Sequence, residues 1–182
     1  MLSNKIPKRK HPRLKQYDYS ANGYYFVTIC CKDMKCFFGK ITHIADNVGL
    51  CFVPNERVYA DTELTLSPPY GQIAEKQLLE LEKRYDYVTI DKYVIMPNHI
   101  HAILILDGEA AGASPHPTLS DIICAYKSLT TRNCNQFGNC TGRQIFQNSF
   151  YDRILTSEEG YLEVWQYIDE NPRKWQNDKY YI

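Results

Sequence analysis

The chain has 182 residues, 44% of them hydrophobic and 13% aromatic, which excludes a globally disordered protein and suits one domain with its own core. Its 21 basic and 21 acidic residues cancel, so overall charge indicates no particular partner. The N-terminus lacks the apolar core of a signal peptide, no apolar run reaches the length of a membrane span, and the seven cysteines are odd in number. These features predict a cytoplasmic protein with free thiols.

The charge is uneven at the N-terminus, where residues 1–16 hold six Lys or Arg residues and no acidic residue. Such an arm can follow a phosphate backbone. A solvated, poorly ordered terminus has the same composition, so both interpretations stay open. We treat residues 1–16 as a basic arm and residues 17–182 as a single domain.

The first predicted elements come from aromatic, β-branched and helical patterns. Residues 23–31 are predicted to form a strand, and residues 36–44 to continue the same sheet. Residues 45–65 are predicted to form a hairpin or an irregular excursion. Apolar residues at helical spacing, together with strong helix formers, predict a helix over 70–85.

Two strands with a very short connection follow. Residues 87–97 and 99–106 are predicted to pair antiparallel, because only the dipeptide "PN" joins them. The composition of residues 107–117 predicts a loop. Ser120 is predicted to cap the next helix, which continues to Asn133 with an apolar stripe on one face.

The C-terminal part is predicted to hold one more helix. Residues 146–155 are predicted as a short strand or an irregular stretch, and Ser157 as the start of the last helix. That helix should end near Asn171, because Pro172 disfavours helical geometry in the residue before it. Interleaved strands and helices with short strand–strand connections predict an α+β fold with one mostly antiparallel sheet.

The most apolar stretch, "YVIMPNHIHAILIL", contains two histidines at alternate positions, His99 and His101. Alternate side chains of a strand share a face, so the two imidazoles project together from Cα atoms ~6.5 Å apart, while Ile100 points the other way. Two such imidazoles can hold one divalent cation, but histidines with purely structural hydrogen bonds fit the pattern equally well. A catalytic metal site needs a further ligand from elsewhere.

The last predicted helix offers a tyrosine and an amide. Tyr167 and Asn171 are four residues apart in "YIDEN", which places them on one helical face. Each alone fits a structural role, since the chain has 15 tyrosines and an Asn before Pro commonly ends a helix. Tyr161 lies about 240° around the helix from Tyr167, which favours one nucleophile over a pair.

The chain resembles the REP-associated tyrosine transposases, relatives of the small insertion-sequence transposases with one catalytic tyrosine. "MPNHIHAIL" resembles their histidine–hydrophobic–histidine (HUH) motif, and the other matching segments occur in the expected order: "RLKQYDYSANGYYFVTICCKD", "CFFGKI", "PTLSDIICAYKSLTTR", "SFYDRIL" and "YIDENPRKW". The resemblance implies a ferredoxin-like α+β sandwich, with a central, mostly antiparallel sheet and helices on one face. Residues 48–59 look like an insertion with no assigned role.

The resemblance also implies a chemistry. It implies a metal-dependent nuclease and transposase that cuts and rejoins single-stranded DNA through a 5′-phosphotyrosine. Tyr167 matches the nucleophile of the family. His99, His101 and Asn171 match the ligands of a divalent metal, Mg²⁺ or Mn²⁺.

The implied partner is single-stranded or hairpin DNA, bound by a monomer or a homodimer. Arg13, Lys127 and Arg132 are the residues expected to contact it. Phe146 and Asn148 depart from the family, which often has a basic residue and a tryptophan there, and this departure concerns DNA affinity. Two alternatives remain: a nucleic-acid-binding protein of the same fold that does not cut, and an unrelated α+β protein whose histidines are structural.

Overall fold

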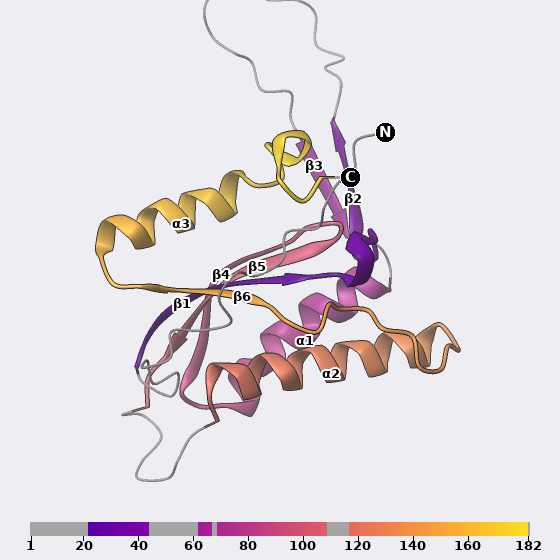
Figure 1. Cartoon of the computed structure of the whole chain (residues 1–182), viewed down its shortest axis with the longest axis horizontal. Coiled ribbons are helices and arrows are strands. Elements are labelled where there is room, and N and C mark those ends of the chain that lie inside the picture. The colour runs from indigo at the N-terminus through magenta and orange to yellow at the C-terminus, as the bar shows by residue number, and fades with distance from the viewer. Residues whose placement is uncertain (1–21, 44–61, 67–68, 109–116, 182) are drawn as a thin grey trace, which may run out of the picture.

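The computed structural model describes four parts of the chain: residues 22–43, 62–66, 69–108 and 117–181. The basic arm with Arg13 and the insertion at 48–59 lie outside the described residues. The described parts form a four-stranded sheet with two helices below it and a third above it in the view of Figure 1.

The four-stranded sheet has the order β4-β5-β1-β6, and each neighbouring pair is antiparallel. Its strands are β1 (Gly23–Cys30), β4 (Val88–Ile95), β5 (His99–Leu106) and β6 (Tyr151–Leu155). With helices α1 (Tyr70–Arg84) and α2 (Leu119–Phe137), the chain order is β1-α1-β4-β5-α2-β6, which is the ferredoxin-like order. The predicted α+β fold with an antiparallel sheet is therefore confirmed.

Strand β5 is central, because β4 pairs with one of its edges and β1 with the other. Ile100, Ala102 and Leu104 point from β5 into the main core, which α1 and α2 cover. Both faces of β5 are buried, and this explains why its sequence is a nearly continuous apolar run.

Helix α3 (Glu158–Glu170) covers the other face of the sheet. The second core between them consists of Phe26, Val94, Met96, Ile103, Leu155, Val164, Ile168 and Trp175. The expectation of helices on one face therefore holds for α1 and α2, whereas α3 lies opposite (Figure 1). The sheet has an apolar second face, and burial of that face accounts for the position of α3.

The predicted continuation of the sheet over residues 36–44 is wrong. β2 (Gly39–His43) pairs instead with β3 (Thr62–Leu66) in a separate two-stranded sheet. Strand β1 has β5 on one side and β6 on the other, so it offers no free edge to a strand that follows it. The rest of the predicted excursion at 45–65 lies outside the described residues.

The helix starts follow capping chemistry. At α2 the cap is Thr118 rather than the predicted Ser120, because Thr118 and Asp121 form a reciprocal capping box. Ser157 caps α3 as predicted, since its hydroxyl accepts the N–H of Gly160 at 3.1 Å. Asn171 is the C-cap of α3, also as predicted.

Two further expectations concern thiols and membranes. The described cysteines are free: Cys30, Cys31, Cys36, Cys124, Cys134 and Cys140. Among the described helices, none combines the length and apolar character needed to cross a lipid bilayer.

Candidate active site

The histidine pair opens strand β5 and faces α3. Both side chains are fully buried, and their ring centroids lie 4.5 Å apart. The ring of His101 stacks on Phe26 of β1 at 5.3 Å, while Ile100 between the two histidines points into the opposite core. The two imidazoles therefore project together, as the alternation along the strand predicts.

Neighbouring polar groups orient both rings. Nδ1 of His99 lies 2.8 Å from Oδ1 of Asn98, and Nδ1 of His101 lies 2.8 Å from the Thr28 hydroxyl. Because an amide oxygen only accepts, Nδ1 of His99 carries the proton and Nε2 carries a lone pair. A histidine held in this way is prepared to bind a metal through Nε2.

The structure brings Tyr167 and Asn171 to the histidine pair. The Tyr167 hydroxyl lies 3.2 Å from Nε2 of His101, and the two ring centroids are 5.1 Å apart. Tyr167 is 39% exposed, so the site opens to solvent at the phenol, whereas Asn171 is only 3% exposed. The Asn171 side chain hydrogen-bonds Tyr167, so Tyr167, Asn171 and the two histidines form one cluster between β5 and the end of α3.

Two atoms of this cluster are buried without a hydrogen-bond partner among the described residues: Nε2 of His99 and Oδ1 of Asn171. In the described part of the chain, only the hydroxyl of Thr130 shares this property. Leaving a buried polar atom unpaired costs about 1–3 kcal/mol, so two such atoms in one cluster call for a reason. Both are atoms that bind divalent cations.

Burial keeps both imidazoles neutral. Burial first, and then the charge of Lys179, lower the pKa of His99 to about 3. The pKa of His101 is also well below its usual value, because of burial first and then the neighbouring His99 and Lys179. Neutral imidazole is the form that binds metals.

The phenol of Tyr167 is protonated at neutral pH. Burial and the charge of Asp178 raise the pKa of Tyr167 to about 12, against a lowering effect of the Asn171 side chain, which hydrogen-bonds it. A phenol with this pKa needs a means of losing its proton before it can act as a nucleophile.

Sequence reasoning missed the residues that close the site from the C-terminal side. After α3, the short helix η2 (Trp175–Asn177) leads the chain back to the histidines. The ring of Tyr180 lies 4.5 Å from that of His99, and Asp178 belongs to the same group of possible metal ligands as the two histidines. The segment "DKYYI" has no periodicity or spacing that signals this role, so only the folded chain identifies it.

Two of the basic residues predicted to contact DNA lie on α2, which packs on the sheet face opposite the histidines. The ammonium of Lys127 donates to the backbone oxygens of Gln147, Asn148 and Ser149 at 2.5, 3.0 and 3.5 Å, and its burial lowers the pKa of Lys127. Arg132 is exposed. The structure therefore does not bring Lys127 and Arg132 into the histidine cluster, and Arg13 lies outside the described residues.

We expect Lys127→Met to lower the free energy of unfolding by about 1–3 kcal/mol, because it removes a charged donor from three backbone carbonyl groups. The matched change Arg132→Gln should stay within about 0.5 kcal/mol, as is usual for exposed side chains. Urea denaturation followed by circular dichroism measures both. Equal effects of the two substitutions would show that the carbonyl contacts of Lys127 do not stabilise the fold.

The low pKa values of the histidines predict acid destabilisation. An unfolded histidine takes up its proton near pH 6.5, whereas the pKa of folded His99 is lowered to about 3. Between these values the unfolded state binds more protons, so stability decreases by ~1.4 kcal/mol for each unit by which the pH is lowered, for His99 alone. Urea denaturation without divalent metal at pH 6.5, 5.5 and 4.5 measures this. The slope should be smaller in His99→Gln, and equal slopes would contradict the prediction.

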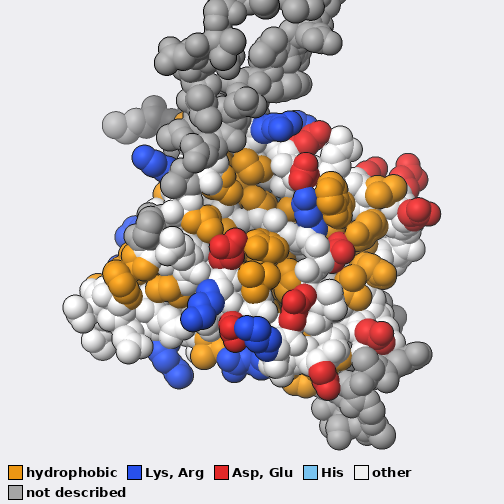
Figure 2. Space-filling model, turned by 180° about the vertical axis from the view of Figure 1, so that it is seen from behind, with side chains coloured by type: hydrophobic (Ala, Val, Ile, Leu, Met, Phe, Trp, Pro, Cys, Tyr) orange, Lys and Arg blue, Asp and Glu red, His pale blue; other side chains and the backbone are white. Residues whose placement is uncertain are grey.

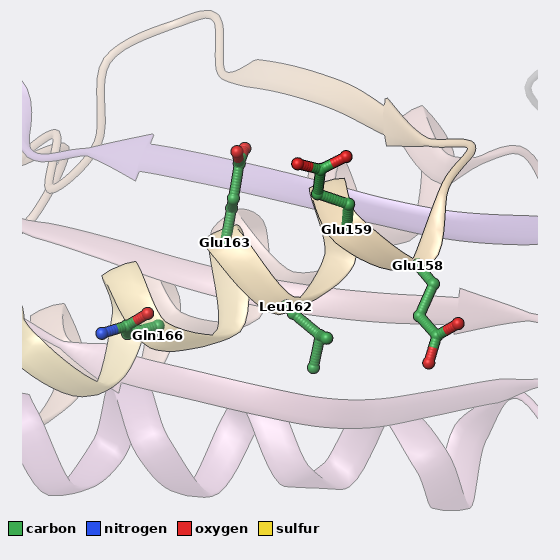
Figure 3. Close-up of a pocket in the computed structure, with 5 residues that line it drawn as sticks. All are labelled: Glu158, Glu159, Leu162, Glu163 and Gln166. Carbon is green, nitrogen blue, oxygen red and sulfur yellow. The ribbon is translucent and has the colours of Figure 1, made fainter.

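A surface hollow on α3 does not belong to this cluster. Its lining residues are Glu158, Glu159, Leu162, Glu163 and Gln166. Figure 3 shows the carboxylates of Glu159 and Glu163 on the same side of the helix. Figure 2 shows acidic side chains gathered at the end of the molecule where α3 begins. Because carboxylates repel a phosphate backbone, this end of α3 is unsuited to DNA.

Comparison with known proteins begins at the level of sequence. No family model matches the chain. An uncharacterised protein of Haemophilus influenzae is 27% identical over 192 residues, which cover 97% of this chain and 95% of that protein. The similarity therefore extends over nearly the whole of both chains.

Solved structures show where the fold recurs. A REP-associated tyrosine transposase bound to a REP hairpin overlays with a TM-score of 0.56 and 15% identity, over 92% of this chain and 77% of that chain. At this identity the overlay shows a shared fold, in agreement with the prediction. A candidate transposase from Deinococcus radiodurans R1 overlays with a TM-score of 0.43 and 15% identity, over 87% of this chain and 95% of that chain, which is too distant to add to the comparison.

Proposed function

We propose that this protein is a metal-dependent HUH nuclease and transposase that cuts single-stranded DNA by joining Tyr167 to a 5′-phosphate. The observation that carries the proposal is the Tyr167 hydroxyl 3.2 Å from Nε2 of His101. Beside it lie two buried ligand atoms without partners in the described part of the chain. The fold shared with a REP-associated tyrosine transposase supports the same assignment.

The donor set fits a divalent cation. Nε2 of His99 and Oδ1 of Asn171 are the unpartnered atoms, and Nε2 of His101 faces the same cluster. We assign Mg²⁺ or Mn²⁺, because substrate phosphate oxygens complete a hard, oxygen-rich shell. A cation held by His99, His101 and Asn171 would supply positive charge to polarise the scissile phosphodiester and to stabilise the charge that develops on its oxygens.

Tyr167 is the proposed nucleophile. Its phenolic oxygen forms a bond to phosphorus while the bond from phosphorus to the 3′ oxygen breaks, and that oxygen leaves as a 3′-hydroxyl after taking up a proton. The product is a 5′-phosphotyrosine with the phosphodiester energy conserved. A second 3′-hydroxyl can therefore reverse the step and join new ends.

The Tyr167 hydroxyl has a defined neighbour before reaction. The Tyr167 hydroxyl faces Nε2 of His101, whose Nδ1 bonds the Thr28 hydroxyl. In the tautomer with the proton on Nδ1, Nε2 has one lone pair, which either accepts from Tyr167 or binds the metal. When His101 acts as a ligand, Tyr167 loses this partner, and its proton can pass to water because the side chain is 39% exposed.

The proposed substrate is single-stranded or hairpin DNA. Tyr24 of β1 and Tyr151 of β6 are 44% and 47% exposed. Tyr151 packs edge-on against Phe26 at 6.5 Å, and Phe26 in turn contacts the rings of His101 and Tyr167. An exposed aromatic ring near the nucleophile, such as Tyr151, can stack an unpaired base, at about 1–3 kcal/mol per base, and Tyr24 offers a second exposed ring on β1.

Phosphate contacts are proposed for Arg13, Lys127 and Arg132. Arg132 is exposed on α2, where its charge can contact a DNA phosphate. Lys127 is the weakest of the three, because its ammonium already bonds backbone oxygens.

The test uses the full chain, a labelled hairpin oligonucleotide with a single-stranded flank, and Mn²⁺ or Mg²⁺. A denaturing gel should show a slowly migrating covalent species that protease removes and that does not form in EDTA. If the protein instead binds the hairpin equally well in EDTA and no covalent species forms with either metal, it is a binding protein of the same fold and the proposal is wrong.

A further inference from the structure

The C-terminal segment places a carboxylate beside the histidine pair. One carboxylate oxygen of Asp178 and one ring nitrogen each of His99 and His101 all lie within 4.8 Å of one another. Buried Trp175 anchors the segment, with its ring centroid 5.9 Å from that of His99. The packing of Trp175, three residues before Asp178, therefore helps to hold Asp178 at the histidines.

Hydrogen bonds fix the same segment on its other side. Oδ1 of Asp178 accepts the backbone N–H of Tyr180 at 2.7 Å. The backbone oxygen of Tyr180 accepts from Nδ2 of Asn98 at 2.8 Å, and Oδ1 of Asn98 orients His99. One continuous set of bonds thus links the Asp178 carboxylate to a proposed metal ligand.

We propose that Asp178 is a fourth protein ligand of the divalent cation held by His99, His101 and Asn171. The inference rests on the proposed function, because it extends the same site. Its support is the cluster of ligand atoms within 4.8 Å, together with the buried Nε2 of His99 that has no partner among the described residues.

A carboxylate changes the character of this site. The two imidazoles and the amide are neutral donors, so Asp178 would bring a negative charge and a hard oxygen to the cation. Carboxylate oxygen suits Mg²⁺ and Mn²⁺, whereas imidazole alone suits softer metals. Asp178 thereby explains how a histidine-based site can favour the metals that phosphoryl chemistry uses.

The test is Asp178→Asn, which keeps an oxygen to accept the Tyr180 N–H but removes the charge. Isothermal titration calorimetry with Mn²⁺ alone, without DNA, should show an affinity weaker on the order of tenfold or more. Asp169→Asn is the matched control, because it removes an exposed carboxylate that pairs with Lys92 at 2.6 Å. Its Mn²⁺ affinity should stay within about twofold of the parent chain.

Asp178→Glu keeps the charge and should bind Mn²⁺ more tightly than Asp178→Asn. Circular dichroism checks that each variant is folded. Unchanged or tighter Mn²⁺ binding in Asp178→Asn, with weaker binding in Asn171→Ala, would overturn the fourth ligand and leave the proposed function standing. If Mn²⁺ binding depends on Asp178 but no covalent Tyr167–DNA species forms, Asp178 stands as a ligand and the proposed function is wrong. No Mn²⁺ binding by the parent chain would overturn both.

Discussion

Tyr167→Phe is expected to abolish the covalent protein–DNA species on a hairpin oligonucleotide, with a loss on the order of 10⁴-fold or more in its rate of formation. The substitution removes only the hydroxyl that lies 3.2 Å from Nε2 of His101. The ring remains to pack against Phe26 at 6.1 Å, so the fold of α3 should not change. Denaturing gels of reactions with Mn²⁺ measure the effect.

The matched control is Tyr161→Phe on the same helix. Its hydroxyl bonds Asp91 at 2.8 Å and lies away from the histidine cluster, so adduct formation should stay within about twofold of the parent chain. An adduct of normal yield in Tyr167→Phe would contradict the assignment. A loss in both variants would point to a defect in folding or DNA binding rather than in chemistry.

Tyr167→Phe should also bind Mn²⁺ at least as tightly as the parent chain. The phenol competes for the lone pair of His101, and a neutral hydrogen bond contributes about 1 kcal/mol, so its loss favours the metal by up to about fivefold. Calorimetry with Mn²⁺ alone measures this. Together with the gel, it separates loss of the nucleophile from loss of the metal site.

His99→Gln and His101→Gln are expected to lower Mn²⁺ affinity by roughly 100-fold or more. Mutation of residues that only hydrogen-bond metal ligands already lowers affinity about 10–100-fold. DNA cleavage should fall to the level seen with EDTA. The two rings are the only described histidines in the candidate site, and both are neutral donors because burial lowers the pKa of each. Calorimetry with Mn²⁺ and the adduct gel measure the two effects.

The same two variants test whether the histidines are merely structural. Hairpin binding in EDTA, measured by electrophoretic mobility shift, should persist in both variants. If metal affinity and cleavage are unchanged while stability falls, the histidines serve packing and the metal assignment is wrong.

The candidate site was predictable where local geometry places its residues. The period of two along β5 puts His99 and His101 on one face, and the helical period puts Tyr167 one turn before Asn171. Both relations depend only on neighbours in the chain. The short connection before β5 likewise leaves an antiparallel pairing with β4 as the simplest outcome.

What the sequence determined by itself is therefore the three helices, the strands β1, β4 and β5, and the spacing of the reactive side chains within them. The tertiary structure alone decided which face of the sheet α3 covers, and that β2 pairs with β3 outside the main sheet. It also decided that Asp178 and Tyr180 lie against the histidines. It also decided that Lys127 bonds backbone oxygens rather than standing free on α2. These outcomes depend on contacts between segments that are distant in the chain. Burial of apolar surface selects among the possible contacts, and no local sequence pattern specifies which segments meet.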